Sequence, residues 1–246
     1  MEPQNDLVAG RNAVMELIKS GVQISRIMVS NRSREGSVLH ILALAREQNV
    51  LVKEVALEKL NALYPSGNHQ GVIAFISPIE FAEVEDLLEK AKETGEPPFL
   101  VILDGIMDVH NLGAIARTAE AAGAHGLILG KHRTASVTPI AVKASAGALF
   151  HIPVARVTNI PAVIDELKEK GVWICGTHQD ASMEYHEADL KGPLGVVIGG
   201  EDKGMSRLVQ DKCDFIVKIS MKGKMASLNA SNAAAVILFE ALRQRR

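Results

Sequence analysis

Six short apolar runs, separated by segments with helical periodicity, occupy the chain from residue 99 onward. Each run fits a strand that is buried on both faces of a parallel sheet. The runs cover residues 99–103, 126–129, 152–157, 172–176, 195–198 and 215–219, and the helical patterns cover residues 112–122, 140–148, 161–170 and 230–243. The predicted fold class is therefore α/β, with a parallel sheet and helices on both of its faces.

A smaller alternation of the same kind precedes this region. Helical patterns at residues 8–18 and 37–48 alternate with strand patterns at 24–29, 51–55 and 71–76, which predicts a small α/β domain over residues 1–76. The next segment, residues 77–98, has prolines at both ends and carries seven acidic and two basic side chains. We interpret it as a linker to a second domain at residues 99–246.

The formal net charge of −2 does not by itself favour a nucleic-acid binder. However, residues 17–34, 121–164 and 215–239 contain no acidic side chain. If the fold gathers these stretches on one side, they form the positive surface that a phosphate backbone requires; the alternative is ordinary solvated faces. Aromatic residues make up only 4% of the chain, so few stacking platforms for single-stranded bases are expected.

Several classes of protein lack support in the sequence. No apolar run approaches the roughly 20 residues of a membrane span, and the first residues do not resemble a signal peptide. The two cysteines make no disulfide framework, and the eight histidines show no metal-ligand spacing, so we expect a soluble, cytoplasmic protein without a bound metal. Phosphate-binding glycine loops and the serine-hydrolase motif are also missing.

Three loops follow predicted buried strands, where ligands bind in parallel α/β sheets. They lie at residues 104–111, 199–206 and 220–229, and carry the sequences NLGAIARTA (111–119), GGEDKGMS (199–206) and ISMKGKMASLNAS (219–231). Each alone is compatible with helix capping, by Asn111, Glu201 and either Ser227 or Asn229. Their occurrence in this order, each after a buried strand, is far more specific.

These three motifs resemble those of the SpoU (TrmH) family of SPOUT methyltransferases over residues 99–246. Residues 1–76, with VAGRNAV at 8–14, resemble the L30e-like RNA-binding domain of some members. The resemblance implies a C-terminal trefoil knot, a homodimer formed through the knotted domain, and S-adenosylmethionine as cofactor. The layout is similar to that of members that methylate a guanosine ribose of 23S rRNA.

The resemblance also implies roles for particular residues. Cofactor contact falls to Gly199, Ile219 and Leu228, and the catalytic set is Arg117, Asn111, Glu201, Ser227 and Asn229. Because a guanidinium stays protonated in proteins, our hypothesis is that Arg117 clamps the target phosphate and favours the developing alkoxide rather than acting as a base. Candidate RNA contacts are Arg11, Asn12, Arg26 and Arg32.

Three alternatives remain at this point. The chain could methylate a ribose in transfer RNA, could be a non-catalytic RNA-binding or ribosome-assembly protein, or could be a nucleotide-dependent Rossmann enzyme. The last lacks every phosphate motif. One departure from the family pattern is Ser220, which stands where a proline is usual and predicts a less rigid turn.

Overall fold

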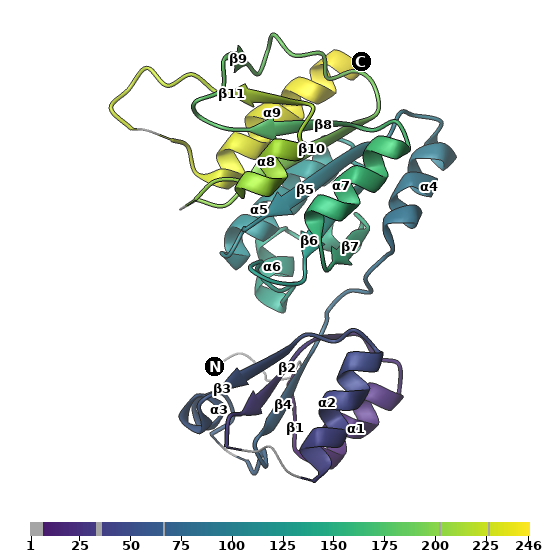
Figure 1. Cartoon of the computed structure of the whole chain (residues 1–246), viewed down its shortest axis with the longest axis vertical. Helices are drawn as coiled ribbons and strands as arrows, with labels where there is room; N and C mark the ends of the chain where they lie inside the picture. Colours follow the sequence, from purple (N-terminus) through teal and green to yellow (C-terminus); the bar gives the residue numbers. More distant parts are fainter. Residues whose placement is uncertain (1–6, 33–35, 66, 202, 226) are drawn as a thin grey trace. The chain divides into compact units, whose positions relative to one another are not determined.

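A computed structural model describes residues 7–246 apart from residues 33–35, 66, 202 and 226. The chain divides into two compact units, one of residues 1–80 with 136–138 and the other of residues 81–135 with 139–246 (Figure 1). Of the predicted linker, residues 77–80 thus fall in the first unit and the rest in the second. Within the described ranges, no helix is long and apolar enough to cross a bilayer.

The first unit is a four-stranded sheet with helices on both faces. Its elements are β1 (Leu7–Ala9), α1 (Arg11–Lys19), β2 (Ile24–Ser30), α2 (Ser37–Glu47), β3 (Val52–Val55), α3 (Leu57–Leu63) and β4 (Val72–Ile76). The strand order is β1-β4-β2-β3, and only β2 and β3 are parallel. Apolar side chains of α1 and α2 share one core cluster with the sheet, and Leu60 of α3 belongs to a second cluster.

The helix predicted for residues 8–18 is wrong at its start. Val8 belongs to β1 and pairs with Ala74 of β4. Gly10, with a φ of 100°, lies between strand and helix, in a conformation that other residues adopt only at a cost. The apolar residues of β1 and α1, which adjoin in sequence, were therefore interpreted as one continuous helical pattern. The sequence also did not predict α3.

The second unit is a seven-stranded sheet in which all pairs are parallel. Its elements are α4 (Val84–Thr94), β5 (Phe99–Asp104), α5 (Val109–Ala121), β6 (Gly126–Gly130), α6 (Pro139–Ala144), a 3-10 turn (Ala148–Phe150), β7 (Val154–Val157), α7 (Ile160–Glu169), β8 (Trp173–Thr177), β9 (Met183–Glu184), β10 (Leu194–Gly199), α8 (Arg207–Lys212), β11 (Phe215–Lys218) and α9 (Ala230–Arg245). The strand order is β7-β6-β5-β10-β8-β11-β9.

Helices cover both faces of this sheet, so the predicted fold class is confirmed (Figure 1). Helices α4, α7 and α8 share a core cluster with the strands, and α5 packs against α6 and α9 on the other side. The acidic helix α4 is part of this core, since Leu87 is fully buried. The trefoil knot stays a prediction.

The helix predicted for residues 140–148 is shorter than expected. Helix α6 ends at Ala144, because Ala146 and Gly147 both have a positive φ (51° and 88°). A separate 3-10 turn follows. The sequence also did not predict β9 or α8.

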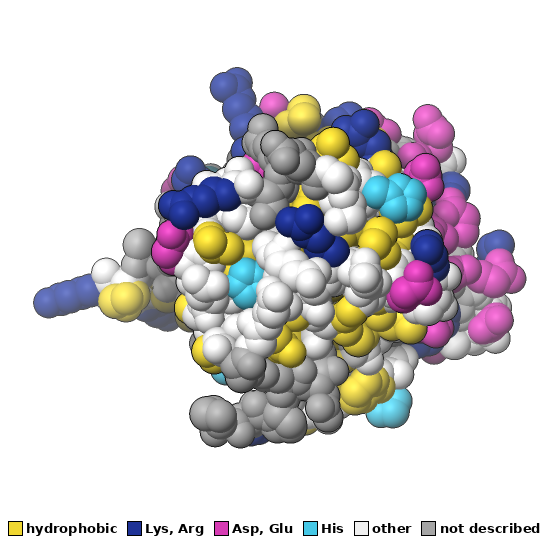
Figure 2. Space-filling view, turned by 90° about the horizontal axis from the view of Figure 1, so that it is seen from below, with side chains coloured by type: hydrophobic (Ala, Val, Ile, Leu, Met, Phe, Trp, Pro, Cys, Tyr) yellow, Lys and Arg dark blue, Asp and Glu magenta, His cyan; other side chains and the backbone are white. Residues whose placement is uncertain are grey.

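Acidic side chains are unevenly distributed over the surface. In the view from below, acidic side chains are seen mainly at the right of the picture, and hydrophobic, uncharged, basic and histidine side chains are seen in its middle (Figure 2).

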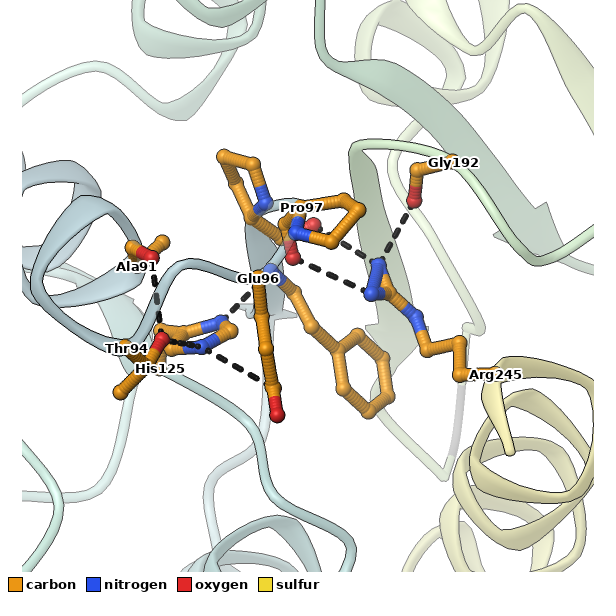
Figure 3. Close-up of polar contacts among 9 residues, drawn as sticks. Ala91, Thr94, Glu96, Pro97, His125, Gly192 and Arg245 are labelled. Carbon is orange, nitrogen blue, oxygen red and sulfur yellow. Dashed lines mark hydrogen bonds and ion pairs between the residues drawn. The ribbon is translucent and has the colours of Figure 1, made fainter.

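The C-terminal end of α9 is anchored beside the start of β5 (Figure 3). The guanidinium of Arg245 donates hydrogen bonds to the carbonyls of Pro97, Pro98 and Gly192 at 3.1, 2.9 and 2.6 Å, and it lies 4.9 Å from the centre of the Phe99 ring. These bonds tie α9 to the segments that lead into β5 and β10.

His125 completes this cluster. Its Nδ1 accepts a hydrogen bond from the Phe99 N–H at 3.0 Å, and its Nε2 lies 3.1 Å from the hydroxyl of Thr94. The ring must be neutral to accept at Nδ1. Burial lowers the pKa of His125, which keeps it in that form.

Candidate active site

Strands β5 and β10 are neighbours in the sheet although they are far apart in the chain. From β5 the chain moves outward through β6 and β7, and later places β10 between β5 and β8. Such a switch in strand order leaves a crevice at the carboxyl ends of the strands. Since Gly199 pairs in register with Asp104, the loops after the two strands begin side by side.

Asp104 holds the loop that follows β10. Its carbonyl accepts a hydrogen bond from the Gly200 N–H at 2.9 Å, and its carboxylate accepts one from the Ser206 N–H at 2.6 Å. Within the loop, the Gly204 N–H donates to the Gly200 carbonyl at 2.8 Å. Sequence reasoning assigned Asp104 no role, although a carboxylate directly after five apolar residues is a visible signal.

Gly199 and Gly200 are required by the packing of the chain itself. A Cβ on Gly199 would lie 2.3 Å from the backbone nitrogen of Met205, and one on Gly200 would lie 2.3 Å from the carbonyl oxygen of Gly105. We expected Gly199 to admit a cofactor closely. The space beside its Cα is instead filled by the backbone of its own loop, although Gly199 also lines a pocket.

The first two loops meet through Asn111 and Glu201. The amide of Asn111 donates a hydrogen bond to the carboxylate of Glu201, across 90 residues of sequence. Asn111 is not the N-cap of α5. That position belongs to Asp108, whose carboxylate accepts hydrogen bonds from the N–H groups of His110 and Asn111.

A pocket of about 290 Å³ lies where the second and third loops converge. Its walls include five of the predicted site residues, namely Gly199, Glu201, Ile219, Ser227 and Leu228. Sequence reasoning missed the wall formed by Thr177 at the end of β8 with His178 and Gln179 after it, and the apolar base formed by α9, including Ile237. Among the residues that the structure describes, the pocket thus has apolar surfaces, loop backbone, the lysines Lys203 and Lys218, and one carboxylate, that of Glu201.

Asn229 does not line this pocket. Its side-chain oxygen accepts hydrogen bonds from the N–H and the hydroxyl of Ser231, at 2.9 and 2.6 Å, and caps α9. The cap fixes the point at which the third loop enters α9, directly after Ser227 and Leu228. Asn229 therefore acts on the pocket through its neighbours in this structure.

Arg117 lies outside the pocket of its own chain. It is exposed on α5 and makes no hydrogen bond or ion pair with any other residue that the structure describes. Six residues of helix separate it from Asn111, which turns the two side chains about 120° apart. The second and third motifs therefore meet within one chain, and the first contributes Asn111 but not Arg117.

The predicted RNA contacts of the first unit do not form one group. Arg11 and Asn12 line a hollow with Ser37, Leu57 and Gln70. The N-termini of α1 and α2 open into it, and the N-cap residue of each is a glycine, which has no side chain to cap it. The Arg11 N–H donates to the side-chain oxygen of Gln70 at 3.2 Å, and the Arg11 Nε donates to the Gln70 carbonyl at 3.0 Å. Such ends favour anions.

The other two candidates are engaged elsewhere in the same unit. Arg26 lies 4.2 Å from the centre of the Phe75 ring, and burial lowers its pKa. Arg32 is exposed and forms an ion pair with Glu58 at 3.5 Å.

Residues 98–239 match the family described as SpoU rRNA Methylase. The chain belongs to this family. Residues 7–82 match a second family, described as RNA 2'-O ribose methyltransferase substrate binding. The SpoU family assignment makes the chain an RNA methyltransferase, and the non-catalytic and Rossmann alternatives are not supported.

Three similar proteins agree with this family. YacO of Bacillus subtilis (strain 168), whose name places it among TrmH family tRNA/rRNA methyltransferases, is 44% identical over 100% of this chain and 98% of its own length. The SpoU methyltransferase AviRb of Streptomyces viridochromogenes, solved in complex with AdoMet, has 27% identity and a TM-score of 0.62 over 97% of this chain and 90% of its own. An AdoMet-bound rRNA methyltransferase of Sinorhizobium meliloti has 27% identity and a TM-score of 0.60 over 97% and 87%.

Proposed function

We propose that this chain transfers a methyl group from S-adenosylmethionine to a ribose 2'-hydroxyl of RNA, and that the target is a guanosine in 23S rRNA. The observation that carries the proposal is the convergence of the loops after β10 and β11 around one pocket, with Asn111 from the start of α5 bonded to Glu201 in the pocket wall. The rRNA methyltransferase of Sinorhizobium meliloti matches 97% of this chain, and therefore both of its units, which favours ribosomal RNA as the target. A tRNA target is the second candidate, because the name of YacO includes both RNAs.

The pocket suits S-adenosylmethionine in size and chemistry. Ile219, Leu228 and Ile237 offer apolar surface for an adenine, and small-molecule pockets of this kind begin near about 300 Å³. The carboxylate of Glu201 complements a positive charge. When bound, the cofactor supplies a methyl group on a sulfonium sulfur.

The remaining chemistry belongs to the side chains around the pocket. The Asn111 amide holds the Glu201 carboxylate at the pocket wall, so that it can orient the ribose or the cofactor. The exposed hydroxyl of Ser227 is available to the target nucleotide. Positioning of the 2'-hydroxyl against the methyl group is the main source of rate.

Arg117 is proposed to bind the phosphate beside the target ribose. A guanidinium can hold a phosphate with two parallel hydrogen bonds and can stabilise the developing alkoxide. Replacement Arg117→Lys should lower kcat by about 100-fold without changing the affinity for S-adenosylmethionine. Near-normal turnover of this variant would rule out the clamp.

We also propose that the chain is a cytoplasmic homodimer formed through its second unit. Ile140, Phe150 and Phe239 are 49%, 62% and 49% exposed, and they come from elements that pack around α5. Association through this surface would place Arg117 at the interface, within reach of the partner's pocket. Light scattering should give twice the chain mass, and a mixture of Arg117→Ala and Leu228→Asp proteins should recover part of the activity that each lacks.

In the first unit, Arg11 and Asn12 are proposed to contact the RNA at the hollow they line. Because A-form grooves hide the base sequence, this unit selects an RNA shape such as a loop or bulge. Substitution Arg11→Ala should weaken RNA binding and leave cofactor binding unchanged.

Calorimetry and RNA mapping test the function in two steps. Titration with S-adenosylmethionine should show one site per chain; no binding at millimolar concentration would reject the cofactor. Mapping of 2'-O-methyl groups in 23S rRNA and tRNA, from cells with and without the protein, should show one lost ribosomal site. Loss of a tRNA site would select the second candidate.

A further inference from the structure

The short strand β9 lies at the edge of the sheet beside β11. Glu184 of β9 pairs in register with Lys218 of β11, and the Tyr185 N–H donates to the Lys218 carbonyl at 2.9 Å. The segment between β8 and β10 is therefore fixed against the last residue of β11. The third loop leaves the sheet at that residue.

The Glu184 carboxylate contacts the residues on both sides of Ile219. The Ser220 hydroxyl donates a hydrogen bond to it, and the Lys218 Nζ lies 3.8 Å from the same oxygen. The bond from Ser220 is the main cause that lowers the pKa of Glu184, and Lys218 acts in the same direction. The carboxylate is thus ionised at neutral pH and bridges the turn.

The hydrogen bond and the ion pair of Glu184 both affect the pocket, because Lys218 and Ile219 are part of its wall. The bond to Ser220 restricts the backbone that presents the Ile219 side chain. The ion pair offsets the charge of an ammonium group in a wall that faces the proposed sulfonium. Two positive charges in one pocket repel each other, so this offset favours the cofactor.

We propose that Glu184 is a positioning residue for S-adenosylmethionine, which holds the Lys218–Ser220 turn and neutralises Lys218. This inference rests on the proposed function.

The test compares S-adenosylmethionine with S-adenosylhomocysteine, whose sulfur is neutral, by calorimetry on the full chain. Glu184→Ala should weaken both ligands by about tenfold, through loss of a charged hydrogen bond. Glu184→Gln keeps an acceptor and removes the charge, so the ratio of the two dissociation constants should shift about threefold against the sulfonium. Ser220→Ala should weaken both ligands equally, by about threefold.

Glu187→Gln is the matched control. Glu187 lies on the same segment and accepts a hydrogen bond from the Glu184 N–H at 3.0 Å, but it does not line the pocket. The Glu187→Gln protein should bind both ligands with the affinities of the unmodified chain. A thermal melt of each variant checks folding, and the ratio measured for Glu184→Gln carries the test if Glu184→Ala does not fold.

Two results would overturn the inference. One is binding by a folded Glu184→Ala protein within twofold of the unmodified chain, and the other is an unchanged ligand ratio in Glu184→Gln. If the unmodified chain binds neither ligand, the proposed function itself fails, and the two failures are thereby distinguished.

Discussion

The two ends of strands β5 and β10 are built in opposite ways. At the amino ends, Arg245 and His125 satisfy backbone groups of the segments that enter the strands, and both lie in or near the core (Figure 3). Beyond the carboxyl ends, Glu201 after β10 and Ser227 after the nearby strand β11 are exposed and line a pocket. At the amino ends polar side chains only anchor the chain, whereas at the carboxyl ends Asp104 anchors a loop and other polar side chains face a pocket.

Helix α9 links the two ends. Its first turns form part of the pocket, and Arg245 in its last turn is held by three carbonyls. Besides this support, hydrogen bonds hold polar groups at the carboxyl end, from the Asn111 amide to Glu201 and from the Ser206 N–H to Asp104. We therefore expect changes at the carboxyl end to affect binding and changes at the amino end to affect stability.

The largest effect is expected from Gly199→Ala. Its Cβ would lie 2.3 Å from the Met205 nitrogen, which is backbone and cannot rotate away, so the loop must shift. We expect affinity for S-adenosylmethionine to fall by about 10- to 100-fold, equivalent to 1–3 kcal/mol of strain, as measured by calorimetry. Gly192→Ala is the control, because nothing lies within 4 Å of its Cβ. Equal affinities of the two variants would contradict the packing argument.

A smaller effect, on stability alone, is expected from Arg245→Ala. The guanidinium would lose three hydrogen bonds, one to a half-buried residue and two to exposed ones, together with its contact with the Phe99 ring. This loss should lower the free energy of unfolding of the second unit by about 2 kcal/mol and its Tm by about 4–8 °C. Affinity for S-adenosylmethionine at 20 °C should stay within twofold. Arg207→Ala, which removes only an exposed pair with Asp211 at 3.9 Å, should leave the Tm nearly unchanged. A large loss of affinity for S-adenosylmethionine in Arg245→Ala would contradict the view that the amino ends affect stability alone.

The smallest effect is a pH dependence of stability at His125. Burial lowers the pKa of His125 in the folded chain, so the unfolded chain takes up the proton first as pH falls. The contribution of His125 is complete above the unfolded pKa, near 6.5, and is lost as pH falls from there toward the folded pKa. Urea unfolding between pH 7.5 and 5.5 should show this loss, with a slope below about 1.4 kcal/mol per pH unit for one proton. His125→Asn should reduce the slope of unfolding free energy against pH. An unchanged slope would mean that other titratable groups cause the pH dependence.

The sequence predicted much of the second unit because its strands are buried on both faces. The apolar runs identified every strand in it except β9. Of the three loops predicted after those runs, the two after β10 and β11 line the pocket. The first unit was less clear, since β1 is only three residues long and merges with α1 in any hydrophobic pattern.

Contacts between distant residues could not be predicted in the same way. Ser220 suggested a loose turn, and nothing near it in sequence indicated the bond to Glu184, which lies 36 residues away. The Arg117 side chain points away from that of Asn111 because both residues lie on one helix. This can be deduced only once it is known that α5 begins before Asn111. The packing role of Gly199 depends on how the loop after it folds back.

The position of α9 also bears on when the protein becomes competent during translation. The pocket draws its walls from residues 177 to 237, so a nascent chain lacks a complete site until α9 has emerged from the ribosome and docked. Incomplete chains would carry the whole first unit without the means to modify an RNA that it holds.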